Sequence, residues 1–206
     1  QFLEIFQEYN LAIWPAQIVA YLIGIIALLL AIYRTYYTDK AIASFLALFW
    51  LWTGFFYHLA FFSTINQAAF LFGSLFVLQG LLLLYAGLFK DLVHFHVRWD
   101  IYGIIGWTLI LYAMLIYPII GSYLGHGYPS APMFGVAPCP MTIFTFGLLL
   151  WTKGNVPIWL LIIPFLWSLI GFVAAINLGI IEDTGLLVSG VLGTGMLLYR
   201  KLDGSK

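Results

Sequence analysis

The sequence predicts an all-α integral membrane protein, a helical bundle in which residues 1–206 form one domain with seven transmembrane helices. Three observations predict this class. Hydrophobic residues make up 64% of the chain and charged residues only 8%, whereas a soluble domain carries roughly 25% charged residues. Apolar runs of about 20 residues, the length that crosses a bilayer, recur along the chain. All eight Lys and Arg residues fall on one side of a seven-span topology.

The apolar runs are continuous and rich in Leu, Ile, Ala and Phe, without the strict alternation of a membrane β-strand. Because backbone groups in lipid must be satisfied within the protein, such runs favour helices. The predicted spans are residues 14–33, 41–62, 68–89, 101–120, 141–152, 156–177 and 184–199.

Residues 1–13 precede the first span and are expected to form a short helix lying on the membrane surface. Phe2, Ile5, Phe6 and Tyr9 share one face of that helix, and Glu4 and Glu8 lie on another. The chain begins with Gln1 rather than Met, so we expect processing or further residues before it. We see no cleavable signal peptide, and the first span is expected to act as the insertion signal.

The basic residues predict the orientation. They occupy only the loops after spans 1, 3 and 5 and the C-terminal tail: Arg34, Lys40, Lys90, Arg98, Lys153, Arg200, Lys201 and Lys206. Cytoplasmic loops of membrane proteins carry the excess of Lys and Arg. The sequence therefore predicts a multi-pass protein of the cytoplasmic (inner) membrane, with its N-terminus outside and its C-terminus inside.

The fifth predicted span, 141–152, is too short to cross a bilayer alone. It follows a Gly- and Pro-rich segment, residues 121–140, that contains no Lys or Arg. One interpretation is a half-helix preceded by a loop that re-enters the membrane, which is tolerated where the loop is buried in protein or lines a cavity. The alternative is a surface hairpin packed on the ends of the helices.

This segment also holds most of the reactive side chains of the predicted outer face. His126 and Tyr128 lie within it, and Cys139 stands between two prolines at the start of span 5, followed by Thr142. A cysteine at a helix N-terminus feels the positive end of the helix dipole, which favours the thiolate. These residues are candidates for a binding site, with an inert, buried Cys139 as the alternative.

Three further candidates fall on the same predicted side. His58 lies one turn from the end of span 2, and Glu182 and Asp183 precede span 7. With His126 and Cys139 as the best metal candidates, this set could bind copper or zinc. A haem between His58 and His126 is a second possibility. The spacing matches no compact metal motif, so simple hydrogen bonding of these side chains is favoured and the cofactor stays unknown.

On the other predicted side, His94 and His96 alternate with Val and Phe in the loop after span 3. A His-x-His pair can bind metal when the chain is extended. The alternation instead predicts a short strand-like or interfacial segment.

Charge limits the function classes. The spans hold no Asp, Glu, Lys or Arg at mid-depth, which disfavours a proton pump or an ion-coupled carrier. The formal net charge is zero, without a basic tail, so nucleic acid is not an expected partner. Beyond the lipid bilayer, we expect contacts with other membrane subunits or with copies of the same chain.

Three function classes remain. The favoured class is a non-catalytic subunit or scaffold of a larger membrane assembly, based on neutral spans and small-residue stripes such as Ala16, Ala20 and Gly24. The second is a facilitator or binder of a small neutral solute or a metal ion at an outward-facing site around Cys139 and His126. The third is a membrane enzyme that uses this site, although the sequence favours a protein without catalytic activity.

Several segments resemble a bacterial membrane-protein family known only as a domain of unknown function. They are Asn10–Gln17, Tyr57-His58, Leu71–Gly80, the Gly-His-Gly-Tyr-Pro motif of residues 125–129 and the Pro-Cys-Pro-Met-Thr-Ile-Phe-Thr-Phe-Gly motif of residues 138–147. The resemblance covers nearly the whole chain and implies a polytopic helical fold without naming an activity. The family usually has Thr where Met141 stands here, which puts a paired hydroxyl at that position in doubt.

Overall fold

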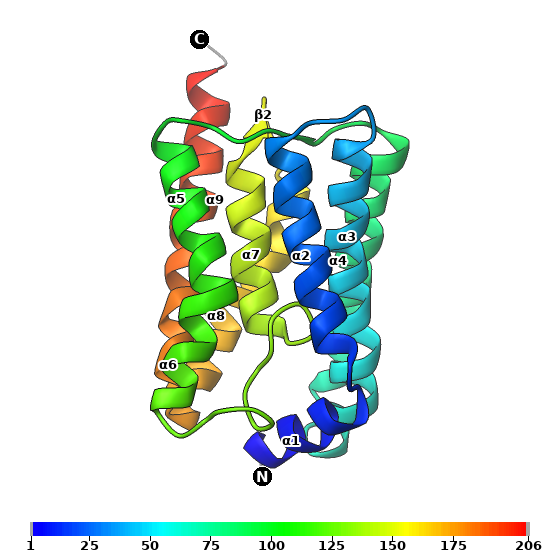
Figure 1. The fold of residues 1–206 in the computed structure, drawn as a ribbon, viewed down its shortest axis with the longest axis vertical. Helices are drawn as coiled ribbons and strands as arrows, with labels where there is room; N and C mark the ends of the chain where they lie inside the picture. The colour runs from blue at the N-terminus through cyan, green and yellow to red at the C-terminus, as the bar shows by residue number, and fades with distance from the viewer. Residues whose placement is uncertain (1, 205–206) are drawn as a thin grey trace.

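The computed structural model describes residues 2–204, with the side chain of Phe2 outside the described part, and shows an elongated helical bundle (Figure 1). Lys206 also lies outside it. The helices are α1 (Phe2–Ala12), α2 (Ala16–Ile32), α3 (Thr38–Trp52), α4 (Ala69–Leu84), α5 (Ile101–Leu111), α6 (Tyr117–Tyr123), α7 (Pro138–Leu150), α8 (Trp159–Leu178) and α9 (Thr184–Asp203). Shorter segments are η1 (Thr53–Phe61), η2 (Phe62–Thr64), η3 (Tyr85–Phe89), η4 (Tyr112–Ile116), η5 (Ile181–Asp183), β1 (His94–Phe95) and β2 (Thr152–Lys153).

Each predicted span coincides with a helical stretch whose ends differ by at most four residues from the prediction. Five stretches within residues 2–204 are long and apolar enough to cross a membrane, and a sixth results if α1 and α2 form one bent span. The 17 residues of α2 reach about 25 Å, and the 13 residues of α7 reach about 20 Å, against a hydrocarbon core of about 30 Å. The all-helical class is confirmed, and seven crossings remain a prediction.

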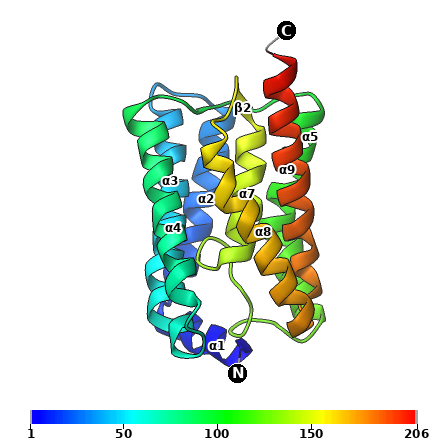
Figure 2. The ribbon, with the colours of Figure 1, turned by 180° about the vertical axis from the view of Figure 1, so that it is seen from behind.

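Helix α7 occupies the centre of the bundle (Figures 1 and 2). All of its residues are buried, as expected for a helix that is apolar on every side. It packs against α3, α5, α8 and α9. Close approach to α5 depends on a pair of glycines, because a Cβ on Gly147 would stand 3.0 Å from the carbonyl oxygen of Gly106.

The segment before α7 runs into the bundle rather than over its end (Figure 1). Residues 131 and 132 and 134–137 are buried, and Gly135 has a φ of +75°, a conformation that favours glycine. A Cβ on Gly135 would lie 2.7 Å from the Cβ of Ala20 on α2. The structure therefore shows irregular backbone buried in protein before a short helix, not a surface hairpin.

Helix α1 lies across one end of the bundle, and its axis is bent by 84° from that of α2. The predicted apolar face exists, but it packs on protein: Phe6 and Tyr9 are buried, and Phe6 stacks on Tyr57 with ring centroids 4.9 Å apart. The Tyr9 hydroxyl donates a hydrogen bond to the carbonyl of Val136 (2.7 Å). This contact ties α1 to the segment that precedes α7.

The opposite end of the bundle, here called the basic end, carries every Lys and Arg between residues 2 and 204. There β1 pairs antiparallel with β2, His94 opposite Lys153, which confirms the strand-like segment predicted at His94. The His94 ring approaches the Asp39 carboxylate (3.3 Å), and Arg200 donates to the carbonyl of Thr152 (2.8 Å). Figure 2 shows β2 beside the last turns of α9 at this end.

Candidate functional site

The candidate site lies at the end away from the basic residues, where α8 turns into α9. Gly179 ends α8 with a φ of 72°, which reverses the chain. The short 3₁₀ turn η5 then directs Glu182 and Asp183 into the bundle, where they are only 1% and 3% exposed. Buried carboxyl groups cost free energy unless they find partners, so their surroundings decide what this end can do.

Asp183 has a strong partner on α6. The hydroxyl of Tyr117 donates a hydrogen bond of 2.6 Å to its Oδ1, and both side chains are buried. The thiol of Cys139 also lies beside this carboxyl group. Asp183 thus joins α6, α7 and the start of α9 at one point.

Glu182 also lies against α6, one turn from Tyr117, because a Cβ on Gly121 would stand 3.0 Å from its Oε1. Both carboxylate oxygens are buried without a hydrogen-bond partner among the described residues. The His126 ring lies beside Glu182, with Nδ1 3.6 Å from Oε1, beyond ordinary hydrogen-bond length. His126 and Glu182 therefore form a loose contact, separate from the hydrogen bond between Tyr117 and Asp183.

Cys139 occupies the first turn of α7, as predicted, and is 8% exposed. The prediction that the helix dipole favours a thiolate is wrong, because the residues around the sulfur do not stabilise a negative charge. The sulfur lies among apolar side chains, the aromatic residues Tyr57 and Trp167 and the carboxyl group of Asp183, and no cationic side chain of the described residues lines this cavity to stabilise a negative sulfur.

A cavity of about 290 Å³ lies between α1, η1, α7 and α8. We call it the Asp183 cavity and define it by Tyr57, Cys139, Trp167 and Asp183, which line it together with mainly apolar side chains. It reaches the surface beside α8, because Val173 and Leu178 of its lining are exposed. The indole Nε1 of Trp167 is buried and has no oxygen or nitrogen acceptor among residues 2–204, and the sulfur of Cys139, a weak acceptor, lies beside it.

His58 lies near this cavity without lining it. The side chain is fully buried, and neither ring nitrogen has a hydrogen-bond partner in the described part of the chain. Aromatic rings enclose it, with centroids 4.6 Å away for Phe76 and 5.2 Å for Trp167. This enclosure leaves no face free for a haem between His58 and His126.

Two predicted site residues lie elsewhere. Tyr128 is 48% exposed and faces Trp14 across 6.3 Å between ring centroids. Thr142 is buried on α7, and its hydroxyl donates to the carbonyl of Pro138 (2.7 Å) within the same helix. The structure therefore brings Cys139 to Asp183 and His126 to Glu182, and leaves Tyr128 and Thr142 outside both pairs.

The described residues contain no group of three or more His, Cys, Asp or Glu side chains that could hold a metal ion. His126 and Cys139, the best metal candidates from the sequence, approach different carboxyl groups, Glu182 and Asp183. The structure thus provides no ligand set from which to develop the metal hypothesis.

The comparison with known families adds one finding to this geometry. A model for a family of unknown function, DUF6064, matches residues 1–205. The chain belongs to the DUF6064 family. No curated protein and no solved structure gives a significant match.

For this DUF6064 chain, sequence reasoning missed three residues of the site: Tyr57, Tyr117 and Trp167. All three are aromatic side chains with a polar tip inside predicted spans, a usable signal because such tips need partners when buried. With 8 Trp and 13 Tyr in the chain, the signal alone could not select these three. A second signal exists only in the structure, where π-helical segments contain Tyr57 (η1) and directly precede Tyr117 (η4); such segments are frequent at functional sites.

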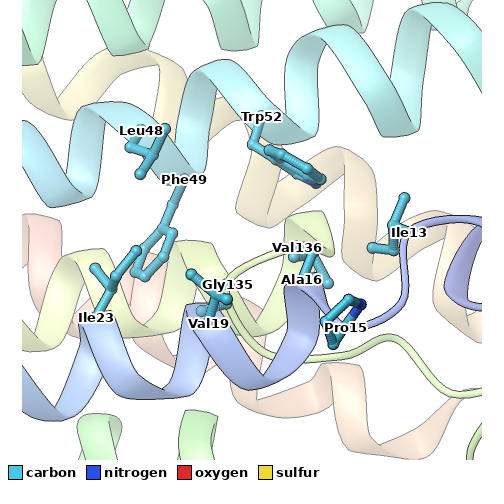
Figure 3. A pocket seen from close by; sticks show the side chains of 11 residues that line it. Ile13, Pro15, Ala16, Val19, Ile23, Leu48, Phe49, Trp52, Gly135 and Val136 are labelled. Carbon is cyan, nitrogen blue, oxygen red and sulfur yellow. The ribbon is translucent and has the colours of Figure 1, made fainter.

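A second cavity of the DUF6064 chain, about 360 Å³, separates α2 from the α3–η1 helix (Figure 3). Its lining is apolar, with Val19 and Ile23 facing Leu48 and Phe49, and Gly135 and Val136 at its inner wall. Its polar atom, the indole N–H of Trp52, already donates to the Tyr9 hydroxyl (2.9 Å). The groove therefore offers packing surface without a free directional group, whereas a buried polar atom without a hydrogen-bond partner in the described part of the chain, Nε1 of Trp167, lines the Asp183 cavity.

Proposed function

We propose that this protein binds a small solute in the Asp183 cavity, as a binder or facilitator rather than as an enzyme. The observation that carries the proposal is a cavity that reaches the surface and holds a buried carboxyl group together with the indole N–H of Trp167, which has the weakly accepting sulfur of Cys139 beside it and no oxygen acceptor among the described residues. Buried polar atoms in proteins are nearly always hydrogen-bonded. A ligand in the cavity would supply the missing partner.

Two further features support a binding role. A cavity of about 290 Å³ lies at the lower end of the size range of small-molecule sites, and such sites combine apolar walls with a few polar groups. The site also lies where a buried irregular segment meets a short helix, the arrangement found at many transporter binding sites.

We place the cavity on the outer side of a bacterial inner membrane, because the basic end should face the cytoplasm. A reporter fused after Lys206 should therefore be active only in the cytoplasm.

The proposal predicts that closing the mouth of the cavity removes the solute. Ala174 lines the cavity and is exposed, so Ala174→Trp should fill the mouth without disturbing the core. Ile176→Trp is the matched control, since Ile176 is 64% exposed on the same helix and does not line the cavity. Native mass spectrometry after gentle purification should show a bound small molecule with the unaltered protein and with Ile176→Trp, and none with Ala174→Trp.

Cys139 gives an independent readout because it is the single cysteine of the chain. Its alkylation by N-ethylmaleimide should slow severalfold in Ala174→Trp and stay unchanged in Ile176→Trp. Equal rates in both variants, together with no bound molecule in any of them, would rule out the cavity as a binding site.

The interpretation as a subunit of a larger assembly stays a prediction from composition. The small-residue stripe of α2, one of its supports, contacts this same chain: a Cβ on Gly24 would lie 2.7 Å from the ring of Phe134. The native mass spectrum described above would reveal stoichiometric partner subunits directly.

A further inference from the structure

The ligand class follows from the charges around the Asp183 cavity, and this step rests on the proposed function. Within residues 2–204, the end that carries the cavity holds four carboxyl groups, on Glu4, Glu8, Glu182 and Asp183, and no Lys or Arg. The ionisable base nearest to them, His126, faces Glu182 rather than the cavity. Among the described residues this end thus carries more acidic than basic side chains, a distribution that favours cations over anions.

The carboxyl group of Asp183 can accept more hydrogen bonds than it receives. A carboxylate offers about four lone-pair sites. One is taken by the Tyr117 hydroxyl, and the Cys139 thiol beside it is a weak donor. A ligand that carries an ammonium group would complete the hydrogen bonding and neutralise the buried charge.

Aromatic rings form much of the remaining wall. Phe6, Tyr57 and Phe62 are stacked in succession, with centroid separations of 4.9 Å and 5.7 Å, and Phe72 meets Trp167 edge to face at 5.4 Å. All five line the cavity. Stacking covers both faces of Tyr57, so the ring faces left for a ligand belong to the other four side chains. Ring faces attract cations, and aromatic cages are a common means of binding quaternary ammonium groups.

Metal cations fit this lining poorly. Calcium takes six to eight oxygen ligands and magnesium requires near-octahedral oxygen coordination, whereas one carboxyl group, that of Asp183, lines the cavity among the described residues. An organic cation replaces those oxygens with ring faces. The buried N–H of Trp167 can also donate a hydrogen bond, and a hydroxyl group on the organic cation would accept it.

We propose that the Asp183 cavity binds a small organic cation, an amine or quaternary ammonium compound that also carries an oxygen, with its charged group between the Asp183 carboxylate and the aromatic wall. Asp183 provides the charge, the rings provide selectivity for an ammonium over a metal ion, and the Trp167 N–H orients the oxygen end.

The test compares choline with its neutral carbon isostere, in which carbon replaces the quaternary nitrogen, by calorimetric titration of the purified full chain in lipid nanodiscs. Choline should bind at least about tenfold more tightly than the isostere, since a desolvated cation–π contact and a buried carboxylate both favour the charge. Asp183→Asn should remove most of this preference and keeps an oxygen acceptor for Tyr117. Glu8→Gln, which removes an exposed carboxylate from the same end, should keep it. Trp167→Phe keeps a ring and removes the N–H, so it should weaken both molecules alike.

The outcomes separate the two proposals. Equal binding of choline and its isostere to the unaltered protein, both abolished by Ala174→Trp, would overturn the organic cation and leave the solute site standing. Absence of binding for choline, ethanolamine and tetramethylammonium alike would also overturn the organic cation. The comparison within the unaltered protein remains decisive if Asp183→Asn fails to fold.

Discussion

Replacing Gly103 by Ala is expected to destabilise the protein by about 3 kcal/mol or more, because the added methyl group would overlap the carbonyl oxygen of Arg98. Gly103 is buried in the first turn of α5, where its N–H donates to the side chain of Asp100 (3.0 Å). Its carbonyl accepts from the indole of Trp151 (3.2 Å). The three nearest atoms all belong to the Arg98 backbone, so the methyl group fits only if one of the two backbone segments moves.

Gly195→Ala is the matched control, since nothing lies within 4 Å of a Cβ at that exposed position of α9. Alanine is a better helix former than glycine by roughly 1 kcal/mol, so this variant should be at least as stable as the unaltered protein. The measurement is the free energy of unfolding in mixed micelles. Similar values for the two alanine variants would show that α5 and the Arg98 backbone separate more easily than the packing implies.

The helical stretches could be predicted from the sequence because each of them is a continuous apolar run with polar residues at its ends. Even the weakest prediction, the short helix after a buried segment, follows from the length of the run after Cys139 and from the prolines before it. The clustering of Lys and Arg on one side could also be predicted, since every Lys and Arg between residues 2 and 204 lies at the basic end.

The face that α1 presents could not be assigned in the same way. Ile5, Phe6 and Tyr9 do form an apolar stripe, but a stripe indicates only that something apolar covers it. In the structure the cover is the bundle itself, through Tyr57 and the carbonyl of Val136. Nothing local to residues 2–12 distinguishes lipid from protein as that partner.

Most residues of the candidate site could be predicted from the sequence, but the contacts between them could not. Cys139, His126, Glu182 and Asp183 were chosen because they fall on one predicted side of the membrane. Which pairs form depends on the reversal at Gly179, which brings the adjacent Glu182 and Asp183 to different partners, His126 in the loop after α6 and Tyr117 on α6. The aromatic partners, Tyr117 and Trp167, come from helices far away in the sequence, and a linear pattern does not identify such contacts.

The hydrogen bond between Tyr117 and Asp183 should be among the most stabilising polar contacts at this end of the bundle. Tyr117→Phe removes the hydroxyl that donates to Oδ1 and leaves a buried carboxyl group with one donor fewer. Hydrogen bonds to charged groups contribute about 1.5–3 kcal/mol, so the free energy of unfolding in mixed micelles should fall by that amount. Tyr112→Phe is the matched control: its hydroxyl donates to the neutral backbone carbonyl of Glu182 (2.6 Å), and its loss should cost about 1 kcal/mol.

A double-mutant cycle tests whether the charge of Asp183 is responsible. In the Asp183→Asn background the acceptor is a neutral amide oxygen, so Tyr117→Phe should then cost only about 1 kcal/mol. An undiminished cost in that background would assign the effect to packing of the Tyr117 ring between α6 and α7. A diminished cost would establish a charged carboxylate in the Asp183 cavity, the group on which recognition of an organic cation depends.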